Sequence, residues 1–379
     1  MTIHSLYIHL PWCLRKCPYC DFNSYPAEKN SIPEESYIQQ LIANLRKLGK
    51  IWEIGPLATI YIGGGTPSLF SPSSIQRLLE ETHRLVGIDA QAEISMEINP
   101  GTVNAQQLRE LSRCINRFSF GVQSFNDKCL RSIQRIHSAA QAKNAIYMAQ
   151  DAGISNINLD LMHGLPEQGI HEALSDLNTA LELKVPHISW YELTLEEGTT
   201  FGNNPPENLP DQELCECIEE TGLEFLKNSG FLRYEISAFT CNQSFCRHNL
   251  TYWNYLDYAG IGAGAHSKYT DHKNGRIMRL FQEENPQDFL KDNLFTDHLR
   301  IVPDQELPFE YLLNTTRLYR HFISFQDFYL KTRLNPDVLM PQLKAADACG
   351  FIELEEEGFQ LTQFGHYFTN HFLEMFLPF

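Results

Sequence analysis

Residues 7–20 read YIHLPWCLRKCPYC and contain three cysteines, Cys13, Cys17 and Cys20. Three thiolates at this spacing can hold three irons of a [4Fe–4S] cluster and leave the fourth iron open to a ligand that is not protein. An iron with an open position is a chemical site. The stretch therefore directs the interpretation of the rest of the chain.

A structural zinc site and unrelated free thiols are the alternatives for these cysteines. Structural zinc takes four ligands, usually from spaced pairs, and no second Cys or His pair lies nearby in the sequence. His9 is a fourth candidate, but the alternating apolar run around it directs the ring elsewhere. The chain has 10 cysteines in 379 residues and no signal peptide, which indicates a reducing compartment without disulfides.

The spacing C-x3-C-x2-C, with Tyr19 before the last cysteine, resembles the radical S-adenosylmethionine (radical SAM) superfamily. Residues 7–13 and 21–24 narrow the resemblance to the branch that holds oxygen-independent coproporphyrinogen III oxidases and HemW-type heme chaperones. The resemblance implies that S-adenosylmethionine chelates the open iron through its amino and carboxylate groups. It also implies that an electron from the cluster cleaves this cofactor to a 5′-deoxyadenosyl radical.

Length and charge bound the class of protein. A chain of 379 residues suggests two or three domains. The 30 basic and 47 acidic residues give a net charge of −17, and no Lys/Arg run interrupts it, so nucleic acid is not an expected partner. No apolar run reaches the ~18 residues of a membrane span, and the first residues lack a basic start. We expect a soluble, cytoplasmic protein.

Strand-like and helix-like segments alternate along the first 235 residues, which predicts βα units and a parallel sheet. Ser71-Pro72 and Asp211 are helix start signals before residues 75–86 and 214–226. The resemblance implies an α/β fold, a partial (β/α)6 radical SAM barrel over residues 1–235. The six predicted strands are Ser5–Leu10, Ala58–Ile62, Glu93–Ile98, Arg117–Val122, Ile157–Leu161 and His187–Leu193.

Polar residues follow each predicted strand, where α/β proteins place their active sites. The cysteines follow the first strand and the run GGGTP (63–67) follows the second. This run is open to interpretation as an ordinary turn, as a phosphate loop, or as backbone that approaches a ligand closely. The residues after the other four strands are Glu97, Gln123, Asp160 and Thr194.

The resemblance assigns these residues to S-adenosylmethionine. Gly64, Gly65 and Thr66 match the motif that contacts its amino group. Arg135 is the natural carboxylate partner because a guanidinium can bond both oxygens. A buried Glu97 needs an ammonium or a ribose hydroxyl, and the alternative is a solvated strand end. Three further residues match positions that line the nucleoside or methionine, and these are Tyr7, Tyr19 and Thr194.

Phe22 departs from the oxidase pattern. The oxygen-independent oxidases carry a further cysteine at this position, and a phenyl ring can neither bind metal nor transfer a proton. Residues 248–253, HNLTYW, match instead the H-N-x-x-Y-W motif of the HemW-type chaperones, whose histidine is implicated in heme binding. A neutral imidazole is a good axial ligand, so His248 is the predicted heme residue. A satisfied loop histidine is the alternative, and His266 in the glycine-rich run 258–267 is another candidate ligand.

The C-terminal third differs from the barrel. Residues 236–281 form a predicted linker region with the heme motif, and residues 282–379 a mostly helical, winged-helix-like domain. Its predicted helices include one over residues 306–319 and a final one from 363 to about 376. Residues 300–379 hold six basic and eleven acidic residues, so we expect a lid or docking surface rather than a DNA-binding module. The ending 372–377 is interpreted either as core packing or as a surface for a membrane-associated acceptor.

The preferred hypothesis is a heme chaperone that binds a [4Fe–4S] cluster, S-adenosylmethionine and heme, and passes heme to an acceptor hemoprotein. It needs an electron donor for the cluster. The alternative is an oxygen-independent coproporphyrinogen III oxidase of porphyrin biosynthesis, which removes carboxyl groups from the propionates. Whether the chain is an enzyme is left open, and a radical SAM enzyme with another substrate is a third hypothesis.

Overall fold

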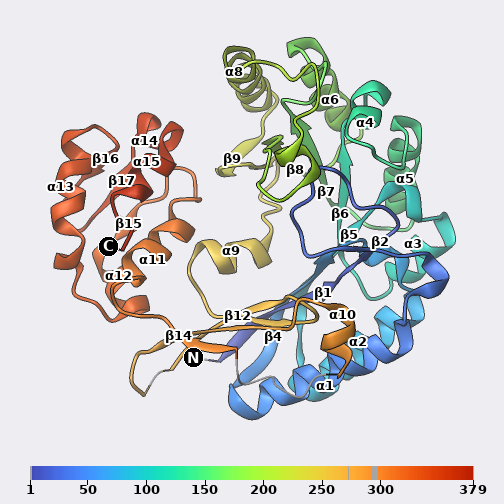
Figure 1. The fold of residues 1–379 in the computed structure, drawn as a ribbon, viewed down its shortest axis with the longest axis horizontal. Helices are drawn as coiled ribbons and strands as arrows, with labels where there is room; N and C mark the ends of the chain where they lie inside the picture. The colour runs from blue at the N-terminus through green and yellow to red at the C-terminus, as the bar shows by residue number, and fades with distance from the viewer. Residues whose placement is uncertain (1, 272, 292–297, 379) are drawn as a thin grey trace.

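The computed structural model describes residues 2–271, 273–291 and 298–378 and shows a large parallel sheet wrapped by helices, with a smaller helical unit beside it (Figure 1). All six predicted strands are confirmed. Their buried residues are mostly apolar, as expected for parallel strands with both faces covered, and polar residues such as Ser119 and Asn158 are buried among them. The six are β1 (Ile3–Leu10), β4 (Ile54–Gly64), β5 (Ile88–Ile98), β6 (Arg117–Gln123), β7 (Asn156–His163) and β8 (His187–Glu192).

These strands lie side by side in chain order, and short strands extend both edges. The sheet order is β11-β1-β4-β5-β6-β7-β8-β10-β9, with no pairing of the two edge strands among the described residues, so the barrel is partial. Strand β11 runs parallel to β1, whereas β10 is antiparallel to β8. The added strands are β9 (Leu232–Glu235), β10 (Ala238–Thr240) and β11 (Ala259–Ile261).

Helices form the outer layer around the partial barrel (Figure 1). Both predicted start signals are confirmed: Ser71 Oγ accepts from Ser74 N at 3.3 Å, and Asp211 Oδ1 accepts from Leu214 N at 2.9 Å. The helices are α1 (Glu34–Ile51), α2 (Pro72–Val86), α3 (Ala105–Leu111), α4 (Asp127–Ser132), α5 (Ala139–Asp151), α6 (Ile170–Glu182), α7 (Thr200–Asn203) and α8 (Gln212–Asn228), with short 3-10 turns at Lys29–Ser31, Pro67–Leu69 and Pro100–Thr102.

The region after the barrel contains a three-stranded antiparallel sheet that the sequence did not indicate. Its strands β12 (His266–Thr270), β13 (Ile277–Phe281) and β14 (Leu299–Ile301) follow α9 (Arg247–Trp253). Helix α10 (Pro286–Lys291) returns to α1, where Gln40 Nε2 donates to Phe289 O at 3.1 Å. The predicted domains 1–235, 236–281 and 282–379 stay predictions. Strand β13 pairs with β14 across the predicted boundary between residues 281 and 282.

The C-terminal unit has its own apolar core and a small sheet of order β15-β17-β16. The order helix, strand, two helices and hairpin is compatible with a winged helix, which stays a prediction. The elements are α11 (Leu307–Thr315), β15 (Ile323–Ser324), α12 (Phe325–Thr332), a 3-10 turn (Pro336–Val338), α13 (Met340–Ala348), β16 (Ile352–Leu354), β17 (Gly358–Leu361), α14 (Gln363–Tyr367) and α15 (Thr369–Glu374).

Two predicted helices differ in length. The first was expected over residues 306–319 but ends at Thr315, because the next residues bond to the barrel edge: Tyr319 N donates to Tyr234 O at 3.1 Å. The final helix is divided into α14 and α15 at Phe368. In the ending, Phe372 is 0% exposed and belongs to the core, whereas Leu377 is 47% exposed. None of the described helices is long and apolar enough to cross a bilayer.

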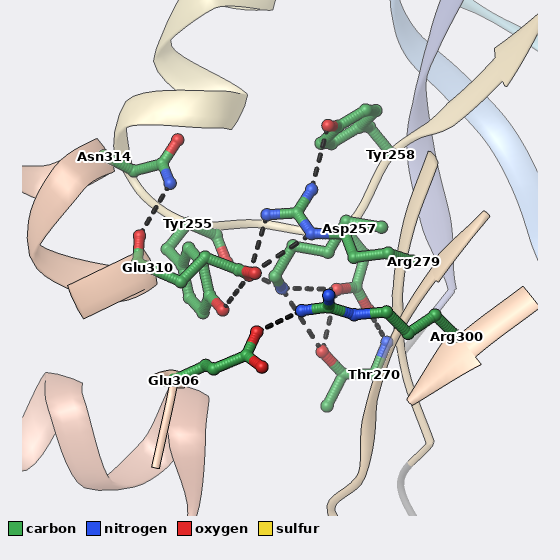
Figure 2. A network of polar contacts seen from close by, with 10 residues as sticks. Tyr255, Asp257, Tyr258, Thr270, Arg279, Arg300, Glu306, Glu310 and Asn314 are labelled. Atoms are coloured by element: carbon green, nitrogen blue, oxygen red, sulfur yellow. Dashed lines mark hydrogen bonds and ion pairs between the residues drawn. The ribbon is translucent and has the colours of Figure 1, made fainter. Parts of the chain in front are cut away.

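A polar network joins the C-terminal unit to the β12–β13 hairpin (Figure 2). Glu310 of α11 accepts from Arg279 Nη2 at 2.8 Å and from Tyr255 OH at 2.5 Å. Arg279 Nη1 also donates to Tyr258 OH at 2.9 Å. The C-terminal unit is thus connected through Arg279 to Tyr258, a residue that reaches the candidate site.

Candidate functional site

A cavity of about 440 Å³ lies at the carboxyl ends of the barrel strands. The structure brings 12 of the 14 predicted site residues into its wall, from the ends of the six barrel strands and the segments that follow them. These 12 are Cys13, Cys17, Tyr19, Cys20, Gly64, Gly65, Thr66, Glu97, Gln123, Arg135, Asp160 and Thr194. The remaining two, Tyr7 and His248, lie elsewhere.

The three cysteines lie on one loop that is held at its base. Ala27 N donates to Cys13 O at 2.9 Å, and Asn23 Nδ2 donates to Ala263 O at 3.0 Å and to Glu284 O at 2.9 Å. Among the described residues, no three His, Cys, Asp or Glu side chains converge as a single metal ion requires. A four-iron cluster takes one thiolate per iron, so three thiols in one cavity fit a cluster better than they fit zinc.

The glycine-rich run is bonded directly to the cysteine loop. Gly65 N donates to Leu10 O at 2.9 Å, and Thr66 N donates to Trp12 O at 2.7 Å. Gly64 has a φ of 122°, which other residues rarely adopt. A Cβ on Gly65 would lie 2.6 Å from the carbonyl oxygen of Trp12. The close approach therefore requires glycine and fixes the cysteine loop against this wall.

Two partly buried carboxylates, Glu97 and Asp160, face the cavity. Glu97 accepts from Tyr61 OH and from Gly64 N, each at 3.1 Å. Burial and the nearby charge of Asp160 raise the pKa of Glu97 to about 7. Burial also raises the pKa of Asp160, which accepts from Ser119 Oγ at 3.1 Å. Two such groups favour a ligand with positive charge and hydrogen-bond donors.

Arg135 and Gln123 also line the cavity. Arg135 Nη1 donates to Cys17 Sγ at 3.5 Å and Nη2 to Gly121 O at 2.5 Å, while its buried Nε has no hydrogen-bond partner in the described structure. Gln123 has a φ of 69°, an unusual backbone conformation that is often found at binding sites. The positive charge of the Arg135 guanidinium in the cavity wall fits a carboxylate ligand.

A second cavity, also of about 440 Å³, adjoins the first and shares Phe22, Gly64 and Glu97 with it. Tyr7 lies in the wall of this second cavity instead of the first. Its hydroxyl is 2.9 Å from His9 Nδ1. The two cavities are therefore neighbours with one common wall.

His248 does not line either of the two cavities. Its side chain is 0% exposed, its Nδ1 is 2.9 Å from Thr59 Oγ1, and its Nε2 is 2.7 Å from Tyr252 OH. Burial, followed by the charge of Arg117, lowers the pKa of His248 to about 3, so the ring is neutral. In this conformation, iron can reach His248 only if one of these hydrogen bonds breaks.

We expect His248→Ala to destabilise the protein by about 2–3 kcal/mol, because it removes the hydrogen bonds to Thr59 and Tyr252 and leaves a gap in place of a fully buried ring. The free energy of unfolding in urea measures the effect. His171→Ala is the control, since that side chain is 92% exposed, and its effect should stay within about 0.5 kcal/mol. Equal stabilities of the two variants would contradict the prediction.

Several lining residues were not predicted from the sequence, among them Tyr61, Ser189 and Tyr191. The register of the sheet explains two of them. Ser189 pairs with Asp160, and Tyr191 lies two residues further along β8, where side chains return to the same face. Tyr191 OH donates to Gln123 Oε1 at 3.1 Å. Inward positions of the predicted strands, counted in steps of two, would have indicated both.

Comparison with known proteins agrees with this geometry. The model of the radical SAM superfamily matches residues 7–180. The coproporphyrinogen III oxidase HemN from Escherichia coli has the same fold, with a TM-score of 0.83 over 99% of this chain and 90% of that one at 19% identity. With its partial barrel and three-cysteine loop, the chain is a radical SAM protein.

Two curated relatives span the full length. The heme chaperone HemW of Escherichia coli (strain K12) is 43% identical over 374 residues, which cover 98% of each chain. The heme chaperone HemW of Haemophilus influenzae is 43% identical over 378 residues, 98% of this chain and 97% of the relative. The chain belongs to the HemW heme chaperone family.

Proposed function

We propose that the protein is a heme chaperone, which holds a [4Fe–4S] cluster and S-adenosylmethionine in the first cavity and transfers heme to an acceptor hemoprotein. The full-length similarity to HemW chaperones carries this proposal. The two adjoining cavities support it, because they provide separate space for a cofactor and for a cargo.

Cys13, Cys17 and Cys20 would bind the cluster, which supplies one electron and an open iron when present. The chain's own residues surround the second ligand. Arg135 offers its guanidinium charge to a carboxylate, and Gly64, Gly65 and Thr66 line the wall beside the cysteines. Glu97 and Asp160 provide negative charge for the sulfonium and amino groups. Tyr19, Gln123 and Thr194 complete the pocket in this proposal.

We expect the affinity for S-adenosylmethionine to increase by up to about tenfold from pH 6 to pH 8, since the pKa of Glu97 is about 7 and a cationic ligand favours its ionised form. The difference from Glu97→Gln isolates this residue from titration of the ligand. Calorimetric titration at several pH values measures it, and parallel pH profiles for the two proteins would contradict the assignment.

The same pKa affects stability without ligand. The folded pKa of about 7 exceeds the ordinary value of 4.5, so the folded state holds the proton more tightly. The resulting stabilisation is present below about pH 4.5 and is lost as the pH rises through 7. As the pH rises from about 4.5 through 7, the free energy of unfolding should therefore fall less for Glu97→Gln than for the native protein.

The partners follow from the same proposal. They are heme, an acceptor hemoprotein and an electron donor for the cluster, in the cytoplasm, and a membrane-associated acceptor remains part of the hypothesis. Nucleic acid does not fit the net charge of −17. The exposed apolar side chains of the C-terminal unit, such as Phe364 at 50% and Tyr329 at 48%, support a docking role for this unit.

One anaerobic experiment separates the chaperone from an oxidase. The reconstituted protein receives heme and an apo-hemoprotein in one arm, and coproporphyrinogen III, S-adenosylmethionine and a reductant in the other. We expect stoichiometric heme binding and transfer in the first arm and no product in the second. Formation of protoporphyrinogen would overturn the chaperone assignment. Phe22, which lines both cavities where the oxidases carry cysteine, favours the chaperone.

A further inference from the structure

Aromatic side chains line much of the second cavity. Tyr252 and Tyr258 meet edge to face, with ring centroids 4.6 Å apart and planes at 80°. Tyr7 and the 59% exposed Phe22 lie in the same lining. Arg279 holds the Tyr258 hydroxyl at 2.9 Å, so this wall is anchored from the C-terminal side (Figure 2). Such walls suit a flat, largely apolar ring system.

Three histidines lie in or next to this cavity, and they differ in the state of their ring nitrogens. Both ring nitrogens of His9 form hydrogen bonds, at 2.9 Å from Tyr7 OH and 2.8 Å from Asn23 O. Both nitrogens of His248 are used as well. His266 lines the cavity, is exposed, and receives no hydrogen bond to its ring from any described residue. A free imidazole at a cavity wall is the group that can bind iron without the loss of an internal bond.

His266 is also held in a fixed place. It begins β12 and pairs with Phe281 of β13, whose ring centroid is 6.0 Å from the imidazole centroid. On the other side, Gln282 N donates to Ala265 O at 2.9 Å. Burial of part of the ring, followed by the charge of Arg279, lowers the pKa of His266 and favours the neutral form that binds metals. A neutral imidazole on a backbone that the sheet fixes is well prepared for ligation.

Charge determines how an anionic macrocycle would be oriented. Glu97 and Glu284 line the second cavity and disfavour carboxylates there. Arg15 and Lys16 line the adjoining cavity, and Lys16 Nζ donates to Phe22 O at 3.0 Å, beside the shared wall. The carboxylates of a bound porphyrin are expected on this cationic side.

We propose that His266 is the axial ligand of the cargo heme in the second cavity, and that His248 is a positioning residue that holds Tyr252 in the cavity wall. This inference rests on the proposed heme chaperone function. It assigns the iron ligand to the histidine that is free, exposed and in the lining. His248 then contributes through its hydrogen bond to the Tyr252 hydroxyl.

Heme titration of the cluster-loaded protein tests the assignment by absorption spectroscopy. We expect His266→Ala to weaken heme binding at least tenfold and to shift the Soret band, and added imidazole to restore the native band. His266→Cys should retain heme with a thiolate-type spectrum. His171→Ala, at a 92% exposed side chain, is the matched control and should bind heme as the native protein does.

The alternatives give distinct results. Native affinity and an unchanged Soret band in His266→Ala would overturn the assignment, while the chaperone function would stand. Loss of the histidine-type spectrum in a folded His248→Gln, with His266→Ala unaffected, would make His248 the ligand. Failure of the native protein to bind heme in stoichiometric amount would overturn the proposed function itself.

Discussion

Cys17→Ala is expected to abolish the iron–sulfur cluster. Cys17 lies in the first cavity with the other two cysteines, and two remaining thiolates leave two of the four irons without a protein ligand. After anaerobic reconstitution, bound iron and the visible absorbance should fall to the background level. The affinity for S-adenosylmethionine should fall as well, because the iron that this ligand would chelate is absent.

Cys217→Ala provides the control for this loss. Cys217 is exposed on α8, away from the lining of both cavities, and should keep full iron content. A Cys17→Ala protein with native iron content would contradict the assignment of the cluster ligands. The fold of both variants is checked by circular dichroism, since Cys17 is outside the apolar core.

Gly65→Val is expected to be the most damaging change in the glycine-rich run. Any Cβ at this position lies 2.6 Å from Trp12 O and 2.7 Å from Trp12 C, and backbone cannot move aside as a flexible side chain can. Overpacking of this kind costs about 1–3 kcal/mol, and here it displaces the loop that carries Cys13. We expect a lower free energy of unfolding and at least a tenfold loss of affinity for S-adenosylmethionine.

Gly49→Ala is the matched control for that substitution. Gly49 lies in α1, and a Cβ there meets no atom within 4 Å. Alanine is the better helix former by about 1 kcal/mol, so this variant should be equally or slightly more stable than the native protein. Native stability and native ligand binding in Gly65→Val would show that the close contact is not required.

The barrel was predictable because each strand carries its information locally. Runs such as Ile157–Leu161 contain residues that favour β-strands, lie between helical segments, and have a polar residue at or near the strand end. This pattern placed Glu97, Gln123 and Asp160 in one cavity before any coordinates were known. The motif GGGTP lies in the same cavity wall, where its glycines allow the close approach to the cysteine loop, and its contact with S-adenosylmethionine stays a prediction.

The remaining features depend on contacts between distant segments. Tyr319, at the end of the predicted helix, instead donates a backbone hydrogen bond to Tyr234 of β9. Strand β13 pairs with β14 across a long connection. Burial of His248 depends on Thr59, 189 residues earlier in the chain. A motif identifies a histidine as important but does not show which way its ring points, and for this reason sequence alone did not distinguish it from His266.

The wall shared by Gly64, Glu97 and Phe22 has a thermodynamic consequence. A ligand that moves this wall or changes the charge of Glu97 alters both cavities at once. Linkage then requires reciprocity: whatever factor S-adenosylmethionine applies to the affinity for heme, heme applies to the affinity for S-adenosylmethionine. In the proposed function, S-adenosylmethionine would therefore act as an effector of heme loading and release, whether or not it is consumed.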